Sequence, residues 1–274
     1  IRQLVRSRGL GDVYKRQGYS NGKTASTATR TLFAGGYYKN AIEYVTVASI
    51  GNATNFGDLT LPRLGCSANN DKVRAVWSGG QGPGHALTNI MDFVSISTTG
   101  NALDFGDIGK AKVVYGSCSS STRGFVQHAN NPTSPVGVIE TFITATAGNA
   151  TEFGDTLSFQ TVYGGASNAT RGIFAGGYLG NNIQYITMAT TGSATDFGDL
   201  INRGYNQTAA TSSTRACVVF YNDYQAPAGT VKINVIQSVE IATTGNAVDF
   251  GDLAYITNDN TQNVQGGSNQ HGGI

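Results

Sequence analysis

The chain contains the stretch Gly51-Asn-Ala-Thr-Asn-Phe56-Gly-Asp58, and four near-copies of it follow. Each copy joins a Gly turn to a Phe-Gly-Asp end, and the phenylalanines are Phe56, Phe105, Phe153, Phe197 and Phe250. Steps of 49, 48, 44 and 53 residues separate successive phenylalanines. A period of about 50 residues is typical of a β-propeller, in which each copy supplies one blade.

The spacing within the repeat is fixed everywhere except in one interval. An arginine lies 18 residues after each of the first four phenylalanines, and one more has the same place ahead of the first; the set is Arg30, Arg74, Arg123, Arg171 and Arg215. An apolar residue precedes each Gly turn by nine residues. The interval from arginine to apolar residue varies, with 12, 17, 16, 12 and 21 residues. Length variation in one loop per repeat usually collects on one face, often the binding face.

Alternating apolar and polar residues between Gly and Asn turns predict four antiparallel strands per repeat, and no helical periodicity competes with them. We therefore expect an all-β propeller of four-stranded blades with negligible helix. The expected blades span residues 18–62, 63–111, 112–159, 160–202 and 203–254. Residues 255–274 are expected to add a closing strand, and a chain that ends on a first strand implies a native ring of more than five blades.

The first residues have a different origin from the repeats. Ser7-Arg-Gly-Leu-Gly-Asp-Val-Tyr-Lys-Arg-Gln17 is similar to an in-frame translation of a transposase sequencing adapter, as a metagenomic sequence could carry. Residues 1–17 are therefore interpreted as a non-native segment and kept out of the fold argument. The competing interpretation is a basic arm that binds nucleic acid.

Composition excludes several classes of function. Residues 1–17 hold five of the 18 basic and one of the 17 acidic residues, so the remainder has 13 basic and 16 acidic residues. This balance gives no electrostatic footprint for nucleic acid, and no apolar run is long enough to insert into a membrane. The three cysteines lack metal-binding spacing and are expected to be small buried strand residues.

Gly-Gly doublets end several expected second strands, as in Leu32-Phe-Ala-Gly35-Gly36 and Ile173-Phe-Ala-Gly176-Gly177. These residues resemble the kelch family of propeller repeats, although Phe stands where kelch blades carry Trp. The amino-acid sequence of the Phe-Gly-Asp stretch resembles repeats in structural, tail-associated or virion proteins of tailed bacteriophages. That resemblance implies a virion or extracellular location and either a protein partner in virion assembly or a glycan of the host surface.

The repeated residues are interpreted as structural. We expect the five phenylalanines to be buried between blades and the five arginines to act as scaffold. The acidic residue before the Phe in copies two to five is a candidate partner for the repeated arginine. Isolated histidines, His85, His128 and His271, are expected on the surface or in loops. We expect no metal, cofactor or catalytic residue.

The variable loops carry the candidate binding residues. These loops are Gly35–Ala41, Gly79–Ile90, Gln127–Val138, Gly176–Asn182 and Phe220–Val235. Their aromatic residues are Tyr37, Tyr38, His85, Tyr178, Tyr221 and Tyr224, with Trp77 nearby. Exposed aromatic rings beside Asn and Gln suit glycan recognition. The sequence favours a non-enzymatic binding or structural propeller. The alternatives are a carbohydrate-active propeller enzyme and a module used only in assembly.

Overall fold

The computed structural model describes residues 23–114, 116–128, 137–157, 164–177, 180–203, 208–219, 222–225 and 229–253. Over these residues the fold is an all-β propeller of five four-stranded antiparallel blades, as expected from the repeat. One short 3₁₀ helix, η1 (Pro83–His85), is the only helix among them. The proposed segment 1–17 and the closing strand within 255–274 lie outside the described residues.

Each blade uses its strands in chain order from the inner to the outer edge. Blade one contains β1 (Lys23–Ser26), β2 (Arg30–Ala34), β3 (Ala41–Thr46) and β4 (Thr54–Asp58). Blade two contains β5 (Ser67–Asn70), β6 (Arg74–Ser78), β7 (Ile90–Ser95) and β8 (Leu103–Asp107). Blade three contains β9 (Gly116–Ser119), β10 (Arg123–His128), β11 (Val138–Ile143) and β12 (Thr151–Asp155).

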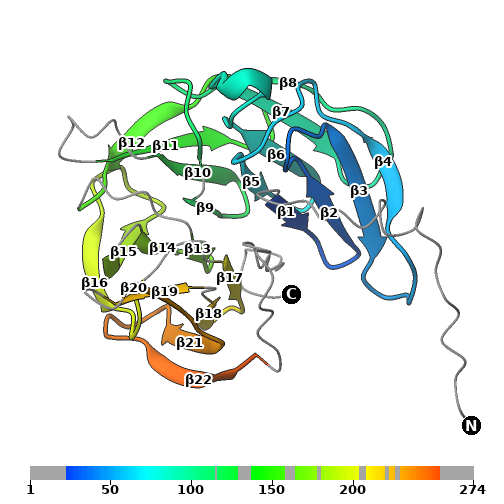
Figure 1. The fold of residues 1–274 in the computed structure, drawn as a ribbon. Coiled ribbons are helices and arrows are strands. Elements are labelled where there is room, and N and C mark those ends of the chain that lie inside the picture. The colour runs from blue at the N-terminus through cyan, green and yellow to red at the C-terminus, as the bar shows by residue number, and fades with distance from the viewer. Residues whose placement is uncertain are drawn as a thin grey trace, which may run out of the picture.

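The last two blades follow the same order with one addition. Blade four contains β13 (Gly164–Ser167), β14 (Arg171–Gly177), β15 (Gly180–Thr187) and β16 (Thr195–Asp199). Blade five contains β17 (Thr208–Thr211), β18 (Arg215–Val219), β21 (Val235–Glu240) and β22 (Val248–Asp252). A separate hairpin of β19 (Asn222–Gln225) and β20 (Gly229–Lys232) lies between β18 and β21. Figure 1 shows the blades following one another around an arc, with β1, β5, β9, β13 and β17 on its inner side.

The Phe-Gly-Asp stretch joins each blade to the next. We call the contact between two successive blades a seam. At the first seam, between blades one and two, the Gly100 amide donates to the Phe56 carbonyl at 2.8 Å, and the Ala102 amide donates to the Asp58 carbonyl at 2.8 Å. The Asp58 amide donates in turn to Asn101 Oδ1 at 3.1 Å. The same three bonds recur at the next three seams, where the side-chain acceptors are Asn149, Ser193 and Asn246. The eight residues recur because one blade's strand end must match the next blade's turn.

The glycine of the motif is required by this close approach. Gly57 has a φ of +156°, and a Cβ built on it would lie 2.2 Å from the Gly100 carbonyl oxygen. Gly106 repeats the arrangement, with a φ of +138° and a built Cβ 2.6 Å from the Gly148 carbonyl. Any larger residue would push neighbouring blades apart, because such approaches of backbone to backbone leave no room for a side chain.

A β-bulge points the phenylalanine into the seam. In blade one, Ile42 pairs with Gly57 and Glu43 with Asn55, so Phe56 is the extra residue of the outer strand. Phe56 lies in the same core cluster as Ala68 and Trp77 of the next blade. Phe56, Phe105, Phe153 and Phe197 are all buried, as expected for seam residues.

Phe250 contradicts the expectation of burial, because its side chain is 53% exposed. Each buried phenylalanine is covered by the blade that follows it, and no blade follows β22 among the described residues. Trp77, expected near the exposed aromatic residues of the binding loops, is not itself exposed. Its side chain is fully buried, and its indole nitrogen donates to the Lys23 carbonyl at 3.4 Å.

Candidate functional site: the variable-loop face

The loops of variable length lie on the same face as the connections between blades. In an up-and-down blade, the loop from the second to the third strand and the link to the next blade leave the sheet at one end. The bonds agree with this arrangement, because the Gly36 amide donates to the Arg63 carbonyl and Leu64 and Gln81 exchange two backbone hydrogen bonds at 2.8 and 2.9 Å. The hairpin β19–β20 extends the longest of these loops, in blade five. We call this end the variable-loop face.

Three of the candidate binding residues meet on this face. Tyr37 and Tyr38 belong to the blade-one loop, and His85 lies in η1 within the blade-two loop. The Tyr38 hydroxyl lies 3.4 Å from His85 Nδ1, and the two rings meet edge to face with centroids 6.4 Å apart. The Tyr37 ring lies 6.2 Å from the Tyr38 ring and is 68% exposed. We call these three residues the aromatic cluster.

The backbone of the aromatic cluster is strained. Tyr37, Tyr38 and His85 have φ angles of 44°, 57° and 64°, and no other non-glycine residue described in the structure has a positive φ. Such a conformation is uncommon for residues with a side chain and costs on the order of 1 kcal/mol or more per residue. Residues that hold it are enriched at binding sites and active sites, so the strain marks this cluster out from the rest of the chain.

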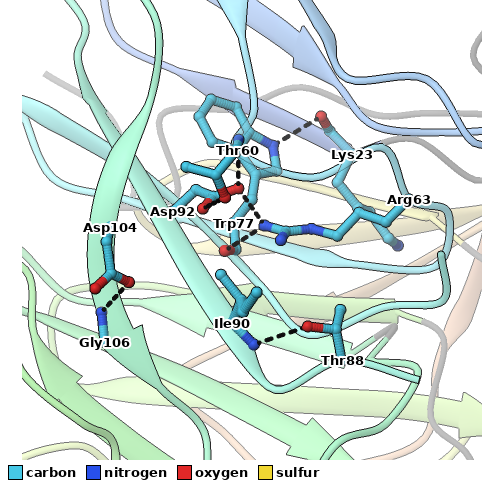
Figure 2. A network of polar contacts seen from close by, with 9 residues as sticks. All are labelled: Lys23, Thr60, Arg63, Trp77, Thr88, Ile90, Asp92, Asp104 and Gly106. Carbon is cyan, nitrogen blue, oxygen red and sulfur yellow. Dashed lines mark hydrogen bonds and ion pairs between the residues drawn. The ribbon is translucent and has the colours of Figure 1, made fainter. Parts of the chain in front are cut away.

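A buried ion pair lies in the contact between blades one and two, and Figure 2 shows its residues. Arg63, in the link between β4 and β5, places its guanidinium 2.8 Å from Asp92 Oδ2, and both side chains are fully buried. Arg63 also donates to the Trp77 carbonyl at 3.1 Å. Thr60 donates to Asp92 through both its backbone amide and its hydroxyl. The ion pair therefore holds blade one against blade two.

The backbone of Arg63 continues this support to the blade-one loop. Its carbonyl accepts from Gly36 at 2.8 Å, and its amide donates to the Lys39 carbonyl at 3.3 Å. Those two partners flank Tyr37 and Tyr38. On the other side, Gln81 Nε2 donates to the His85 carbonyl at 3.3 Å. Both halves of the aromatic cluster thus rest on the link that contains Arg63, a residue that the repeat pattern did not single out.

The position of Asp92 recurs with a common role. In blades three, four and five, the side chain of the residue after the recurring apolar position accepts a hydrogen bond from a backbone amide of the link that leads into that blade. Glu140 accepts from the Gly109 amide at 2.8 Å, Gln184 from the Leu157 amide at 2.8 Å, and Gln237 from the Ile201 amide at 2.6 Å. A polar residue at one phase of an otherwise apolar strand was the sequence signal for this role.

Glu140, like Asp92, has a basic side chain as its neighbour. His128 Nε2 lies 2.9 Å from Glu140 Oε2, and both side chains are buried, so His128 is not the surface histidine that was expected. Burial by itself would raise the pKa of Glu140, but the hydrogen bond and charge of His128, the Gly109 amide and the charge of Lys112 together hold that pKa below its ordinary value.

In blades one, two and four, the repeated arginines contact backbone carbonyls of the next blade and not carboxylates. Arg30 donates to the carbonyls of Ile96 and Ser97 at 2.8 and 2.9 Å, and Arg171 donates to those of Ile241 and Ala242 at 3.2 and 2.8 Å. Arg74 reaches the Thr144 carbonyl at 3.4 Å. The expected pairing with the acid before each Phe is absent among the described residues. Arg215 pairs instead with Glu240 at 2.7 Å.

The cysteines do not provide a reactive thiol. Cys66 and Cys118 are buried as expected, Cys217 is partly buried, and all three are free. Burial raises the pKa of each thiol above its ordinary value. A thiol with a raised pKa is a poor nucleophile at neutral pH.

The remaining candidate residues are not placed by the described geometry. Tyr178, Tyr221 and His271 lie outside the described residues. Tyr224 belongs to β19, whose side chains are also outside the description. Across the described ranges, no group of three or more His, Cys, Asp or Glu side chains is arranged to hold a metal ion. The one described helix is too short to cross a membrane.

In comparisons with known proteins, no family model matches this chain and no curated protein matches it. The propeller architecture therefore rests on the repeat and on the structure.

Proposed function

We propose that this chain is a non-enzymatic binding propeller whose ligand contacts the aromatic cluster on the variable-loop face. The observation that carries the proposal is the strained backbone shared by Tyr37, Tyr38 and His85. The three residues come from loops of two different blades, yet the fold brings their rings together. The hydrogen bonds of the Phe-Gly-Asp stretch and the Arg63 ion pair already join the blades, so contact between blades does not require strained loops. A binding role accounts for strain in two loops at one place.

A surface glycan is the ligand class that this chemistry suits best. The exposed Tyr37 ring offers a flat apolar surface for the C–H face of a sugar, and the Tyr38 hydroxyl and the His85 ring offer hydrogen-bonding groups beside it. Aromatic side chains also bind at a low cost in conformational entropy, because they have few rotatable bonds. The buried Arg63–Asp92 pair beneath would keep the cluster preorganised.

The kelch-like doublets and the resemblance to repeats of tailed-phage structural proteins support a more specific proposal. The protein belongs to a virion or tail, or acts outside the cell, and recognises a host-surface glycan or another virion protein. The resemblance is in the amino-acid sequence of the Phe-Gly-Asp repeat, whereas the side chains proposed to bind the ligand are in the variable loops.

The test is a glycan array together with adsorption to host cells. The triple variant Tyr37→Ala, Tyr38→Ala, His85→Ala should lose at least about tenfold in affinity, as truncation of aromatic anchors usually costs. Leu103→Ala is the matched control, because Leu103 is 63% exposed on β8, a strand away from these loops. Thermal unfolding of both variants checks that the fold is retained.

The outcomes separate the function classes. Glycan binding that survives in the triple variant contradicts the proposed site. A bound glycan that is shortened during incubation identifies the alternative, a carbohydrate-active enzyme, which would need two carboxylates flanking the cleaved bond. Failure of the wild-type protein to bind any glycan or cell surface would leave the assembly role and overturn glycan recognition.

A further inference from the structure

The opposite face of the propeller carries a recurring unit of one arginine and one aromatic ring. In blades one, two and four, the guanidinium lies over a ring of the third strand at 4.7, 4.8 and 4.7 Å from the ring centroid. The pairs are Arg30 over Tyr44, Arg74 over Phe93, and Arg171 over Tyr185. The same guanidinium groups donate to backbone carbonyls of the next blade, so each ring fills a seam that the arginine covers.

Blade three lacks this ring. Leu32 pairs with Tyr44 and Ile173 with Tyr185 across the strands, but the equivalent pair in blade three is Phe125 with Thr141. Large and small residues have exchanged strands. Phe125 then meets Phe153 edge to face at 5.1 Å, a contact that Tyr44 and Tyr185 make with their own seam phenylalanines in blades one and four. The inner part of the seam is therefore filled, while the place of the missing ring is not.

A cavity of about 350 Å³ opens there. Its lining includes Arg123, Thr141, Phe142 and Glu152 from blade three and Thr191 from the turn of blade four. In the part of the chain that the structure describes, the Arg123 guanidinium has no hydrogen-bond, ion-pair or ring partner, unlike the other four repeated arginines. Blade five also has a small residue, Ser238, at the ring position, but its Arg215 pairs with Glu240 and lies over Phe250.

We propose that this cavity, between blades three and four, binds a neutral phenol-type aromatic ring beneath Arg123. The geometry of the other blades defines how such a ring would lie, with the guanidinium over its face. Ile143, two residues along β11 from Thr141 and on the same face, provides an apolar wall. The Thr141 hydroxyl, which donates to the Gly124 carbonyl, can still accept a hydrogen bond from a ring substituent, and the Thr191 hydroxyl can donate to one or accept from one. The positive Arg123 and the negative Glu152 oppose each other, which favours a neutral ligand. The volume is within the range of small-ligand sites.

The ring could come from a free phenol or from a tyrosine of a peptide. Two probes distinguish these sources: p-cresol, which is the tyrosine side chain alone, and N-acetyl-tyrosinamide, which adds the peptide groups. Binding is measured by ligand-observed NMR and calorimetry. We expect p-cresol to bind the wild-type chain with one site and a dissociation constant on the order of 1 mM, typical of so small a ligand. A peptide source requires that N-acetyl-tyrosinamide bind at least as tightly.

Two variants locate the site. Thr141→Tyr restores the missing ring and should weaken p-cresol binding at least about tenfold while raising the unfolding temperature, because it fills the cavity. Tyr185→Thr opens the matched space under Arg171 and should raise the stoichiometry from one site to two. If Tyr185→Thr does not fold, Thr141→Tyr still decides, since it restores a ring that three blades already accommodate and gives up only the hydrogen bond from the Thr141 hydroxyl to the Gly124 carbonyl. Absence of p-cresol binding at about ten times the expected dissociation constant, or equal binding by Thr141→Tyr, overturns the proposal.

Discussion

The seam between blades one and two and the seam between blades three and four share one scaffold but differ at one position. In both, the Phe-Gly-Asp stretch is hydrogen-bonded to the Gly turn of the following blade. At the first seam, the acceptor for the link between blades is the carboxylate of Asp92, paired with Arg63; at the third, it is the neutral amide of Gln184. A neutral amide is sufficient to join two blades. The charged pair is found where two loops must also hold the strained aromatic cluster.

The second seam is intermediate between these two. Glu140 supplies a carboxylate there, and the partner is a histidine rather than an arginine. The backbone bonds of the scaffold are therefore constant along the chain, while the side-chain chemistry at one position is free to vary. We therefore expect the first two seams, which have Asp92 and Glu140 as acceptors, to differ in stability and in pH dependence from the last two, which have Gln184 and Gln237.

The largest expected effect comes from the part that all seams share. Phe197→Ala should lower the free energy of unfolding by about 3–5 kcal/mol, because it leaves a cavity between blades four and five. Phe250→Ala is the matched control and should cost much less, because that ring is already half exposed. Urea denaturation of both variants measures the difference. Equal losses would mean that burial between blades is not what the motif provides.

The next effect separates the ionic seam from the neutral seam. Arg63→Met should cost about 3–5 kcal/mol, because Asp92 would remain buried without its cation. Gln184→Met should cost only about 1–3 kcal/mol, since it leaves a single backbone amide without its acceptor. A double-mutant cycle of Arg63→Met with Asp92→Leu should show that the second change recovers part of the loss. A smaller cost for Arg63→Met than for Gln184→Met would contradict the comparison.

The stability that Glu140 contributes at the second seam should fall in acid. The folded-state pKa of Glu140 is lowered, so its contribution to stability is fully present above the ordinary carboxyl pKa of 4.5 and is lost as the pH falls through the lowered value. Glu140→Gln should therefore lose roughly 1 kcal/mol at neutral pH and approach the wild type in strong acid. Glu152→Gln, at an exposed carboxylate of the neighbouring strand, should show no such convergence. Chemical denaturation across the pH range is the measurement.

The blade architecture could be predicted from the sequence because its signals are local and periodic. The fixed spacings around Phe105 or Arg171 locate strands and turns whatever the neighbouring blade contains. The residues whose environment was predicted wrongly, or not predicted, depend on contacts with other strands and blades. Phe250 is exposed because burial needs a following blade, and His128 is buried because Glu140 pairs with it. Arg63 lies in a link outside the repeated motif, so no spacing identified it.

The candidate site was only partly predictable for the same reason. The loop aromatics Tyr37, Tyr38 and His85 were chosen for their residue type and for the variable loop length. Their meeting across two blades, and their positive φ angles, follow from the three-dimensional path of both loops. The cavity near Arg123 was not anticipated, although Thr141 among Tyr44, Phe93 and Tyr185 at one phase of the repeat was its signal.

The most direct test of the central claim compares binding by two variants on a glycan array and in host-cell adsorption. One variant is Tyr37→Ala, Tyr38→Ala, His85→Ala, on the variable-loop face; the other is Arg171→Lys, on the opposite face. Lysine cannot reproduce the planar contact with Tyr185 or the paired carbonyl bonds, so Arg171→Lys should lower stability by about 1 kcal/mol and bind normally. The triple variant should keep the fold and weaken binding at least about tenfold, because it removes the aromatic cluster. Normal binding by the triple variant, with loss of binding by a folded Arg171→Lys, would place the ligand on the opposite face and contradict the account.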